Sequence, residues 1–324
     1  MKVSVIGCGR WGSFLAWYLA SVGHEVRLYG RKSSAHMQRL LSSRGNGLLT
    51  LPDSVALTTS LSEAAEADTL VISVASQGLR SLMEEIHQTG AKRKTYVLCM
   101  KGIENGSGKR LSEIAGEYAD SASAVAVWLG PGHVQEFAAG IPNCMVIDSR
   151  DEAVKRRLVD AFSGELIRFY YGDDLLGNEI GAAAKNVIGI AAGMLDGLSL
   201  TSLKGALMSR GTREIARLIE AMGGNPRSAY GLCHLGDYEA TVFSPYSHNR
   251  KFGEAFVRGE SYGELAEGYH TAVPLTALGE AYHVDLPICS SVRDILYSGE
   301  DPRQALKRLF LRSLKNEWHS MPPV

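Results

Sequence analysis

The sequence has few cysteines and none of the spacings that bind a metal. Its 324 residues contain five cysteines, and no two of them form a C-x-x-C pair. A scattered, odd-numbered set predicts neither a disulfide framework nor a zinc site. We therefore expect no metal centre, and each thiol is expected to be a small buried side chain. The five are Cys8, Cys99, Cys144, Cys233 and Cys289.

An excess of charge and a long apolar run are also missing. Thirty-four Lys and Arg face thirty-five Asp and Glu, which leaves a net charge of −1. This balance predicts no general attraction to nucleic acid or to an anionic membrane, so any anion site must be local. No apolar run is long enough for stable membrane insertion, and the chain opens without a leader pattern. We expect a cytoplasmic protein with no nucleic-acid partner.

The chain begins with the pattern of a strand, a glycine turn and a helix, within residues 2–23 (KVSVIGCGRWGSFLAWYLASVG). Gly7, Gly9 and Gly12 have G-x-G-x-x-G spacing, directly after a β-branched run and directly before a helical apolar pattern. The first glycine permits the turn, the second lets a pyrophosphate approach the backbone, and the third lets helix and strand pack closely. This context predicts a dinucleotide site, with the phosphates at the helix N-terminus.

The end of the second predicted strand, residues 24–30, indicates which dinucleotide binds. NAD-selective sites have an acid about twenty residues after the glycines, whereas basic residues accommodate the 2′-phosphate of NADP. Here Arg31 and Lys32 follow the strand and no acid does. The pair favours NADP, while a solvated pair of charges and use of NAD stay open.

The remaining pattern alternates strands and helices as far as about residue 174 and is then helical. This order predicts an α/β fold: an N-terminal Rossmann-type, doubly wound, mostly parallel sheet (residues 1–175), then an all-helical C-terminal domain (176–324). Further strands are expected at 69–74, 95–100, 124–129, 145–148 and 166–171, and residues 33–60 are expected to form a helix and an irregular loop. Helices are expected at 61–67, 79–89, 152–162, 178–195, 203–222, 226–232, 252–258, 262–281, 287–297 and 302–315.

Two lysines stand out by position. Lys101 follows a predicted strand, at the carboxyl edge of the sheet where ligands bind in such folds. Lys185 shares its helix face with Gly181, Ala182 and Ile188, so it sits among small apolar residues. Burial disfavours the charged amine and lowers its pKa towards the range useful for proton transfer. The alternative is a lysine whose stem is buried and whose amine reaches water.

Six motifs in order resemble those of the bacterial NAD(P)-dependent glycerol-3-phosphate dehydrogenases. The match extends over nearly the whole chain. The motifs are Gly7-x-Gly9-x-Trp11-Gly12, Met100-Lys101-Gly102-Ile103-Glu104, Gly130-Pro131-Gly132-His133, Asn178-Glu179-x-Gly181-Ala182-Ala183-x-Lys185-Asn186, Arg210-Gly211 with Glu214, and Ser247-His248-Asn249-Arg250.

The resemblance implies an enzyme that interconverts dihydroxyacetone phosphate and sn-glycerol 3-phosphate with NAD(P)H and feeds phospholipid synthesis. It implies three catalytic residues: Lys185 as proton donor and acceptor, Lys101 in contact with the substrate, and Asp237 bound to a substrate hydroxyl. It further implies substrate contacts at Lys101, Gly130, Gly132, Lys185, Asp237, Ser247, His248, Asn249 and Arg250. Cofactor contacts are implied at Gly7, Gly9, Arg10, Trp11, Gly12, Arg31, Lys32, Lys101, Val134, His248 and Glu267. A homodimer is left open.

Two positions depart from the family pattern. The family's Gly-Pro-Ser is Gly130-Pro131-Gly132 here, which removes a hydroxyl, and its Ser-Arg-Asn is Ser247-His248-Asn249, which removes the arginine expected at the substrate phosphate. Histidine offers one donor towards the ligand and is charged only when its pKa permits. Arginine is always charged and can donate two parallel hydrogen bonds. Arg250 is a candidate replacement, and a different substrate is the other explanation.

Two other functions therefore stay open. One is a dehydrogenase of another hydroxy acid or phosphorylated hydroxy compound, which the same fold and a helix-borne lysine would serve. The other is a non-catalytic NAD(P)-binding regulator, although such a protein would not need Lys101, Lys185 and Asp237 together.

Overall fold

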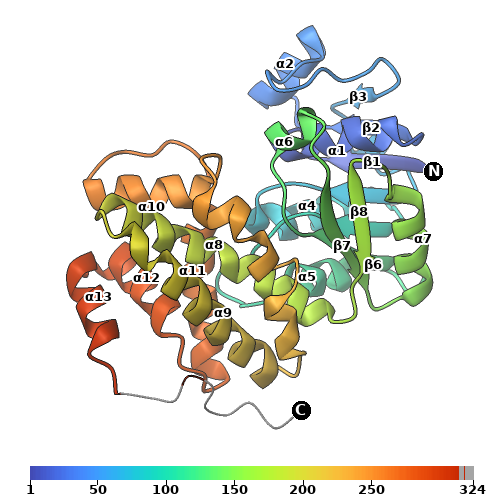
Figure 1. Ribbon diagram of the computed structural model, residues 1–324. Coiled ribbons are helices and arrows are strands. Elements are labelled where there is room, and N and C mark those ends of the chain that lie inside the picture. The colour runs from blue at the N-terminus through green and yellow to red at the C-terminus, as the bar shows by residue number, and fades with distance from the viewer. Residues whose placement is uncertain (314–316, 318–324) are drawn as a thin grey trace.

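The computed structural model describes residues 1–313 and 317, and it consists of a sheet part and a helical part that lie side by side (Figure 1). The sheet part contains every strand of the described residues, from the N-terminus to Tyr171. The helical part follows, with α8 at its centre. The predicted α/β class with a helical C-terminal part is confirmed.

Eight strands form one sheet in the order β3-β2-β1-β4-β5-β6-β7-β8. All neighbours are parallel except β6 and β7, so the last two strands run against the first six. The chain moves outward from β1 to β3 and then returns to β4 on the other side of β1. That reversal places a crevice at the carboxyl ends of β1 and β4, where open α/β sheets bind their ligands.

The strands are β1 (Lys2–Ile6), β2 (Glu25–Tyr29), β3 (Ala56–Thr58), β4 (Thr69–Ile72), β5 (Thr95–Leu98), β6 (Ala124–Leu129), β7 (Asn143–Ser149) and β8 (Ile167–Tyr171). The helices of the sheet part are α1 (Arg10–Ser21), α2 (Ala35–Ser43), α3 (Leu61–Ala64), α4 (Leu79–Gln88), α5 (Leu111–Tyr118), α6 (Val134–Ala138) and α7 (Glu152–Phe162). Those of the helical part are α8 (Leu175–Gly197), α9 (Lys204–Ala221), α10 (His248–Arg258), α11 (Glu267–Ala281), α12 (Pro287–Ser298) and α13 (Pro302–Phe310).

The sheet is covered on both faces because its strands are apolar on both. Val3 and Val5 of β1 pack with Phe14 of α1 and Phe162 of α7 on one face. On the other face Ile6 belongs to the core that α4 and α5 complete. Strands buried on both faces are continuous apolar runs rather than alternating ones, as the sequence has them.

Helix α8 is buried along most of its length because glycines let other elements approach its backbone. A Cβ on Gly193 would lie 1.8 Å from the Arg250 carbonyl oxygen, and one on Gly253 of α10 would lie 2.1 Å from the Ile190 carbonyl oxygen. The two helices therefore touch backbone to backbone. Helices α9, α11 and α12 also pack against α8.

Several predicted boundaries were wrong. Residues 33–60 contain a strand, β3, which pairs only with β2 and is too short to show alternation. Helix α10 begins at His248 rather than at 252, because the Ser247 hydroxyl caps it by accepting the Arg250 N–H at 3.3 Å. Helix α11 begins five residues later than predicted, residues 226–230 form a 3₁₀ helix, and α5 and α6 were not predicted. The last predicted helix ends at Phe310, and Lys315 lies outside the described residues.

All five cysteines are free thiols, and four are buried, as small apolar side chains would be. Within residues 1–313 and 317, no helix combines the length and the apolarity that crossing a bilayer requires.

Candidate active site

The glycine turn after β1 has the geometry that the sequence predicts. Gly7 has φ +113, and a Cβ there would lie 2.1 Å from the Ser73 carbonyl oxygen at the end of β4. A Cβ on Gly12 would lie 1.8 Å from the Gly7 carbonyl oxygen, so the third glycine lets α1 approach the strand. Gly9 instead has no atom within 4 Å of its would-be Cβ. Its backbone faces open space, which fits a pyrophosphate at the N-terminus of α1.

The other predicted cofactor residues of the sheet part surround this turn. Arg10 is the first residue of α1 and is exposed, and Trp11 packs 6.2 Å, ring to ring, from Phe137. Arg31 and Lys32 are exposed directly after β2. Position and exposure leave these groups accessible to a ligand.

Two lysines meet at one carboxylate. Lys101, just after β5, donates to Asp237 Oδ2 at 2.6 Å, and Lys185 of α8 lies 2.8 Å from the same oxygen. Lys101 also donates to the Gly130 carbonyl at 2.7 Å, and Lys185 to the Thr241 hydroxyl at 2.8 Å. Asp237 is 1% exposed. The three predicted catalytic residues are therefore brought together, from β5, α8 and a 3₁₀ turn.

The charges at this cluster favour an anion and a proton donor. Two ammonium groups share one carboxylate, which leaves an uncompensated positive charge. Burial lowers the pKa of Lys185 to about 8; Asp237 opposes this shift and Lys101 adds to it. A buried lysine with such a pKa can exchange its proton near neutral pH.

His133 lies in the loop after β6, close to this cluster. Burial lowers the pKa of His133 to about 4, so its ring is neutral at pH 7. Its Nε2–H donates to the Ala240 carbonyl at 2.8 Å. It is therefore a positioning residue that ties the loop to the segment after Asp237, and it adds no charge.

A chain of amides connects the lysines with the rest of the helical part. Asn186 donates to the Lys101 carbonyl at 3.1 Å and accepts from Asn249 at 3.0 Å. The Asn249 oxygen accepts the N–H of Gly268 at 2.9 Å. These hydrogen bonds connect four elements and fix their relative positions: the end of β5, α8, α10 and α11.

The loop after β6, where substrate contacts are predicted, has no room for the serine of the family pattern. Gly130 and Gly132 have φ +129 and +142, which side chains rarely adopt. A Cβ on Gly132 would lie 2.3 Å from the ring of Phe137. The position of the Phe137 ring therefore excludes a serine side chain at Gly132. Val134, a predicted cofactor contact, is buried at the start of α6.

The Ser247–Arg250 motif divides between the cleft and the interior. His248 bonds the Tyr262 hydroxyl through Nδ1 at 2.6 Å, and burial lowers its pKa, followed by the charge of Arg10. Arg250 instead binds Asp196 at 2.9 Å and Glu254 at 3.0 Å. Asp196 is eleven residues beyond Lys185 on α8, or about 16 Å along the axis. The structure therefore does not bring the Arg250 guanidinium to the two lysines.

Glu267, a predicted cofactor contact, begins α11. Its carboxylate accepts the Ser76 N–H at 3.0 Å and also the Ser76 hydroxyl. Ser76 follows β4, so Glu267 joins the helical part to the carboxyl edge of the sheet. It lies at the cleft, with both of its oxygens already bonded.

Sequence reasoning missed Thr241, and it named Glu179 only as part of a motif. Thr241 accepts from Lys185 inside a π-helical turn, Glu239–Phe243, that no periodicity announces. Glu179 belongs to the same motif as Lys185 but is buried against Arg110 at 2.8 Å and Ser112, where it fixes α8 to the start of α5. Its role is structural.

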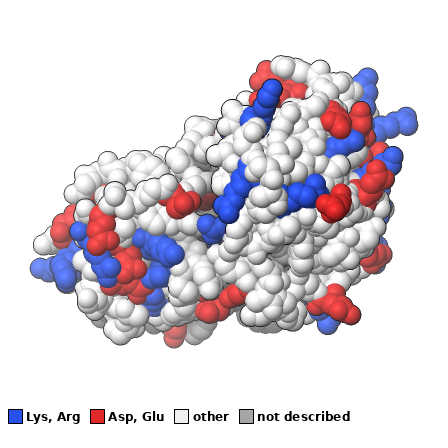
Figure 2. Space-filling model, turned by 90° about the horizontal axis from the view of Figure 1, so that it is seen from above, with Lys and Arg blue, Asp and Glu red and all other residues white. Residues whose placement is uncertain are grey.

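Lysine and arginine side chains gather where the sheet part and the helical part meet, on the face seen in Figure 2. Much of the neighbouring surface is uncharged in that view. A nearly neutral protein thus concentrates positive charge locally, as an anionic ligand requires.

Known families match almost all of this chain. The model of the NAD-dependent glycerol-3-phosphate dehydrogenase N-terminus matches residues 2–155, and that of the C-terminus matches residues 174–307. The glycerol-3-phosphate dehydrogenase NAD(P)+ of Streptomyces coelicolor is 38% identical over 331 residues, 98% of each chain. That of Salinibacter ruber is 36% identical over 330 residues, 98% of this chain and 97% of the relative.

Solved structures agree with these matches. The glycerol-3-phosphate dehydrogenase of Coxiella burnetii has a TM-score of 0.89 and 28% identity, covering 96% of this chain and 99% of that one. A ketopantoate reductase of Ralstonia eutropha has a TM-score of 0.63 at 17% identity over 94% of this chain and 100% of that one, which is a likeness of fold alone. The chain belongs to the NAD-dependent glycerol-3-phosphate dehydrogenase family.

Proposed function

We propose that this protein reduces dihydroxyacetone phosphate to sn-glycerol 3-phosphate with NADPH or NADH and catalyses the reverse oxidation. One observation carries the proposal. Lys101 and Lys185 share a single oxygen of Asp237 at the carboxyl edge of a dinucleotide-type sheet. This arrangement supplies a proton donor and a net positive charge at one place, and both are needed to reduce a ketone that carries a phosphate.

The residues divide the work of the reaction. The cofactor, when bound, supplies or accepts the hydride. The turn of Gly7, Gly9 and Gly12 would hold its pyrophosphate, and Arg31 and Lys32 would face a 2′-phosphate. Lys185 gives its proton to the substrate oxygen that becomes the hydroxyl, and Asp237 keeps the ammonium group aimed at that oxygen.

Lys101 completes the substrate site from the sheet part. Its ammonium group is held between Asp237 and the Gly130 carbonyl, so it is fixed before the substrate arrives. A preorganised cation costs little reorganisation when negative charge develops on the substrate oxygen. Asn249 and Ser247 are proposed to contact the substrate from the start of α10, with His248 in the place of the family's arginine.

Steady-state oxidation of NADPH and NADH with dihydroxyacetone phosphate tests this proposal. We expect turnover with this ketose phosphate and at least about 10²-fold lower kcat/KM with 2-keto acids that lack a phosphate. Preference for a keto acid would favour the hydroxy-acid dehydrogenase. Tight cofactor binding without turnover of either substrate class would favour the regulator.

Four further points stay predictions. They are the supply of glycerol phosphate to phospholipid synthesis, a location in the cytoplasm, a homodimer, and a domain division between residues 175 and 176. Light scattering with size exclusion would give the mass in solution. Separate expression of residues 1–175, monitored by circular dichroism, would test the division.

A further inference from the structure

A large cavity lies in the helical part, and neither Lys101 nor Lys185 lines it. It has a volume of about 1060 Å³, is open on one side, and is lined by residues of α8, α9, α12 and α13. This volume is at the upper end of the range of small-molecule sites, ~300–1,000 Å³. None of the predicted catalytic, substrate or cofactor residues lines it.

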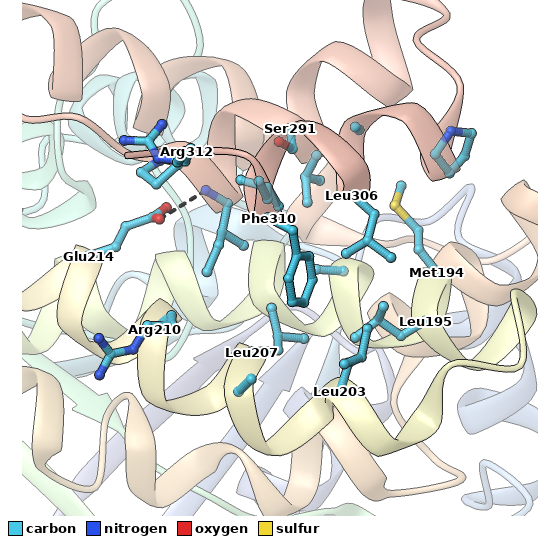
Figure 3. Close-up of a pocket in the computed structure, with 18 of the residues that line it drawn as sticks. Met194, Leu195, Leu203, Leu207, Arg210, Glu214, Ser291, Leu306, Phe310 and Arg312 are labelled. Atoms are coloured by element: carbon cyan, nitrogen blue, oxygen red, sulfur yellow. Dashed lines mark hydrogen bonds between the residues drawn. The ribbon is translucent and has the colours of Figure 1, made fainter. Parts of the chain in front are cut away.

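One end of this cavity is apolar (Figure 3). Met194 and Leu195 of α8, Leu203 just before α9 and Leu306 of α13 form its walls. Phe310 extends between them, although 68% of its surface is exposed. An apolar surface rimmed by polar groups is typical of a ligand-binding groove.

The other end is basic. Arg210, Arg213 and Arg217 occur at helical spacing on α9, and Arg312 faces them after α13. Arg210 pairs with Glu317 at 3.2 Å, and Arg312 pairs with Asp285. The Nε of Arg217 is buried and has no hydrogen-bond partner among the described residues, so one donor is unused.

The acidic groups do not cancel this charge. Among the described residues, the arginines at this end are four, and the carboxylates are Glu214 and Glu317 of the lining together with Asp285, the partner of Arg312. Both oxygens of Glu214 already accept, from the N–H groups of Ile288 and Cys289 at 2.9 Å. Burial also raises the pKa of Glu214 to about 7, so a substantial fraction is neutral at pH 7. Four arginines therefore stand against three carboxylates among the described residues at this end, which leaves one positive charge in excess.

An apolar channel that ends at cations matches an amphiphile with an anionic head. We propose that this cavity binds a single alkyl chain against α8 and α13, with a carboxylate or a phosphate monoester at the arginine row of α9. The inference does not depend on the proposed reaction, because neither Lys101 nor Lys185 lines this cavity, although α8 contributes to both places.

Calorimetry on the full chain tests the site with three probes of equal chain length, all below their micellar concentrations. They are dodecanoate, dodecyl phosphate and dodecyltrimethylammonium. We expect at least one of the two anions to bind tenfold or more tightly than the cation, and the anion that binds better identifies the head group. Shortening the chain by two carbons should weaken binding by up to about tenfold, because each buried methylene contributes to affinity. Equal binding of the cation, or no binding of any probe, would overturn the proposal.

Two variants locate the ligand. Ala206 is an exposed residue of the cavity wall, and Ala206→Trp should weaken anion binding at least tenfold. The matched control is Ala122→Trp, an equally exposed alanine of the sheet part, which should leave binding unchanged. Arg217→Gln should weaken both anions about tenfold and leave the cation unaffected, because a charge-assisted contact is lost.

A third variant is needed in case Ala206→Trp does not fold. A measurement of mass in solution tests whether a second copy of the chain occupies the cavity instead. If Ala206→Trp does not fold, Leu306→Asp serves instead, since it adds a negative charge to the apolar wall. Unchanged binding in a folded variant would show that the ligand sits elsewhere. If sedimentation shows that Ala206→Trp or added dodecanoate separates a dimer into monomers, the cavity is an interface between copies and the proposal is wrong.

Discussion

The sheet part and the helical part contribute to the cleft in different ways. The sheet part presents mainly backbone, namely a glycine turn after β1 with open space at Gly9 and the carbonyl of Gly130, together with the side chain of Lys101. The helical part presents side chains from separate elements, with Lys185 on α8, Asp237 in a 3₁₀ turn and Thr241 in a π-helical turn. The comparison teaches that cofactor binding should tolerate many side-chain changes, whereas proton transfer should depend on a few groups.

Lys185→Met should have the largest effect. It should lower the rate of proton transfer and leave cofactor binding unchanged. Methionine has a similar length but cannot transfer a proton, so kcat should fall by about 10²-fold or more. The Kd of NADPH, measured by fluorescence titration, should stay within about twofold of the parent value. Near-normal turnover would make Lys185 structural.

The pH dependence of the reaction should follow Lys185. Reduction requires its ammonium form, so with a pKa of about 8 the rate of reduction should fall about tenfold per pH unit above 8. Oxidation requires the neutral amine and should rise with pH up to about 8. The second ionisation of a phosphate monoester lies near pH 6, so the substrate does not obscure this window.

Lys101→Met sharpens the pH experiment. The charge of Lys101 lowers the pKa of Lys185, so removing that charge should move the inflection to higher pH. An inflection that stays in place would show that another group controls the rate.

His248→Arg should have a smaller effect, confined to the substrate. Burial lowers the pKa of His248 from its ordinary 6.5, so the ring is mostly neutral at pH 7. If His248 loses its charge as the pH rises, the KM for dihydroxyacetone phosphate should rise below pH 6.5. An ordinary histidine would give this rise in the window of pH 6 to 8. A permanent guanidinium should therefore lower the KM for dihydroxyacetone phosphate at pH 7 by about five- to tenfold.

Arg250→Ala is the matched comparison for His248. Because Arg250 is held by Asp196 and Glu254, its loss should lower the melting temperature by several degrees but leave that KM within about twofold. A large rise of KM would show that Arg250 does replace the missing arginine.

Arg31→Ala with Lys32→Ala should have the smallest effect and should test the sheet part. Both side chains are exposed, so we expect the KM for NADPH to rise about fivefold. The KM for NADH should hardly change, because NADH lacks the 2′-phosphate. Equal changes for both cofactors would make the pair an ordinary solvated surface.

The two parts were also unequally predictable from sequence. The turn of Gly7, Gly9 and Gly12 could be predicted because a strand, a turn and a helix are contiguous and each leaves a local pattern. The meeting of Lys185 with Asp237 could not be predicted from the residues alone. Fifty-two positions separate them, and Asp237 lies in a short 3₁₀ turn without periodicity. Only the resemblance to a family joined them. The ion pair of Arg250 could not be predicted for the same reason, because its partner Asp196 is remote in sequence.

The amide chain has a consequence for transplanting this site onto another scaffold. Its bonds run in one direction, because Asn186 must turn its NH₂ towards Lys101 and its oxygen towards Asn249. Asn249 donates through its NH₂ to Asn186, so its oxygen is the atom that accepts the Gly268 N–H. A designer who copied the two lysines and Asp237 without these amides would leave the orientation of each group undefined. The smallest portable unit is therefore five side chains, the Lys101 carbonyl and one backbone N–H, drawn from four elements and the turn that bears Asp237.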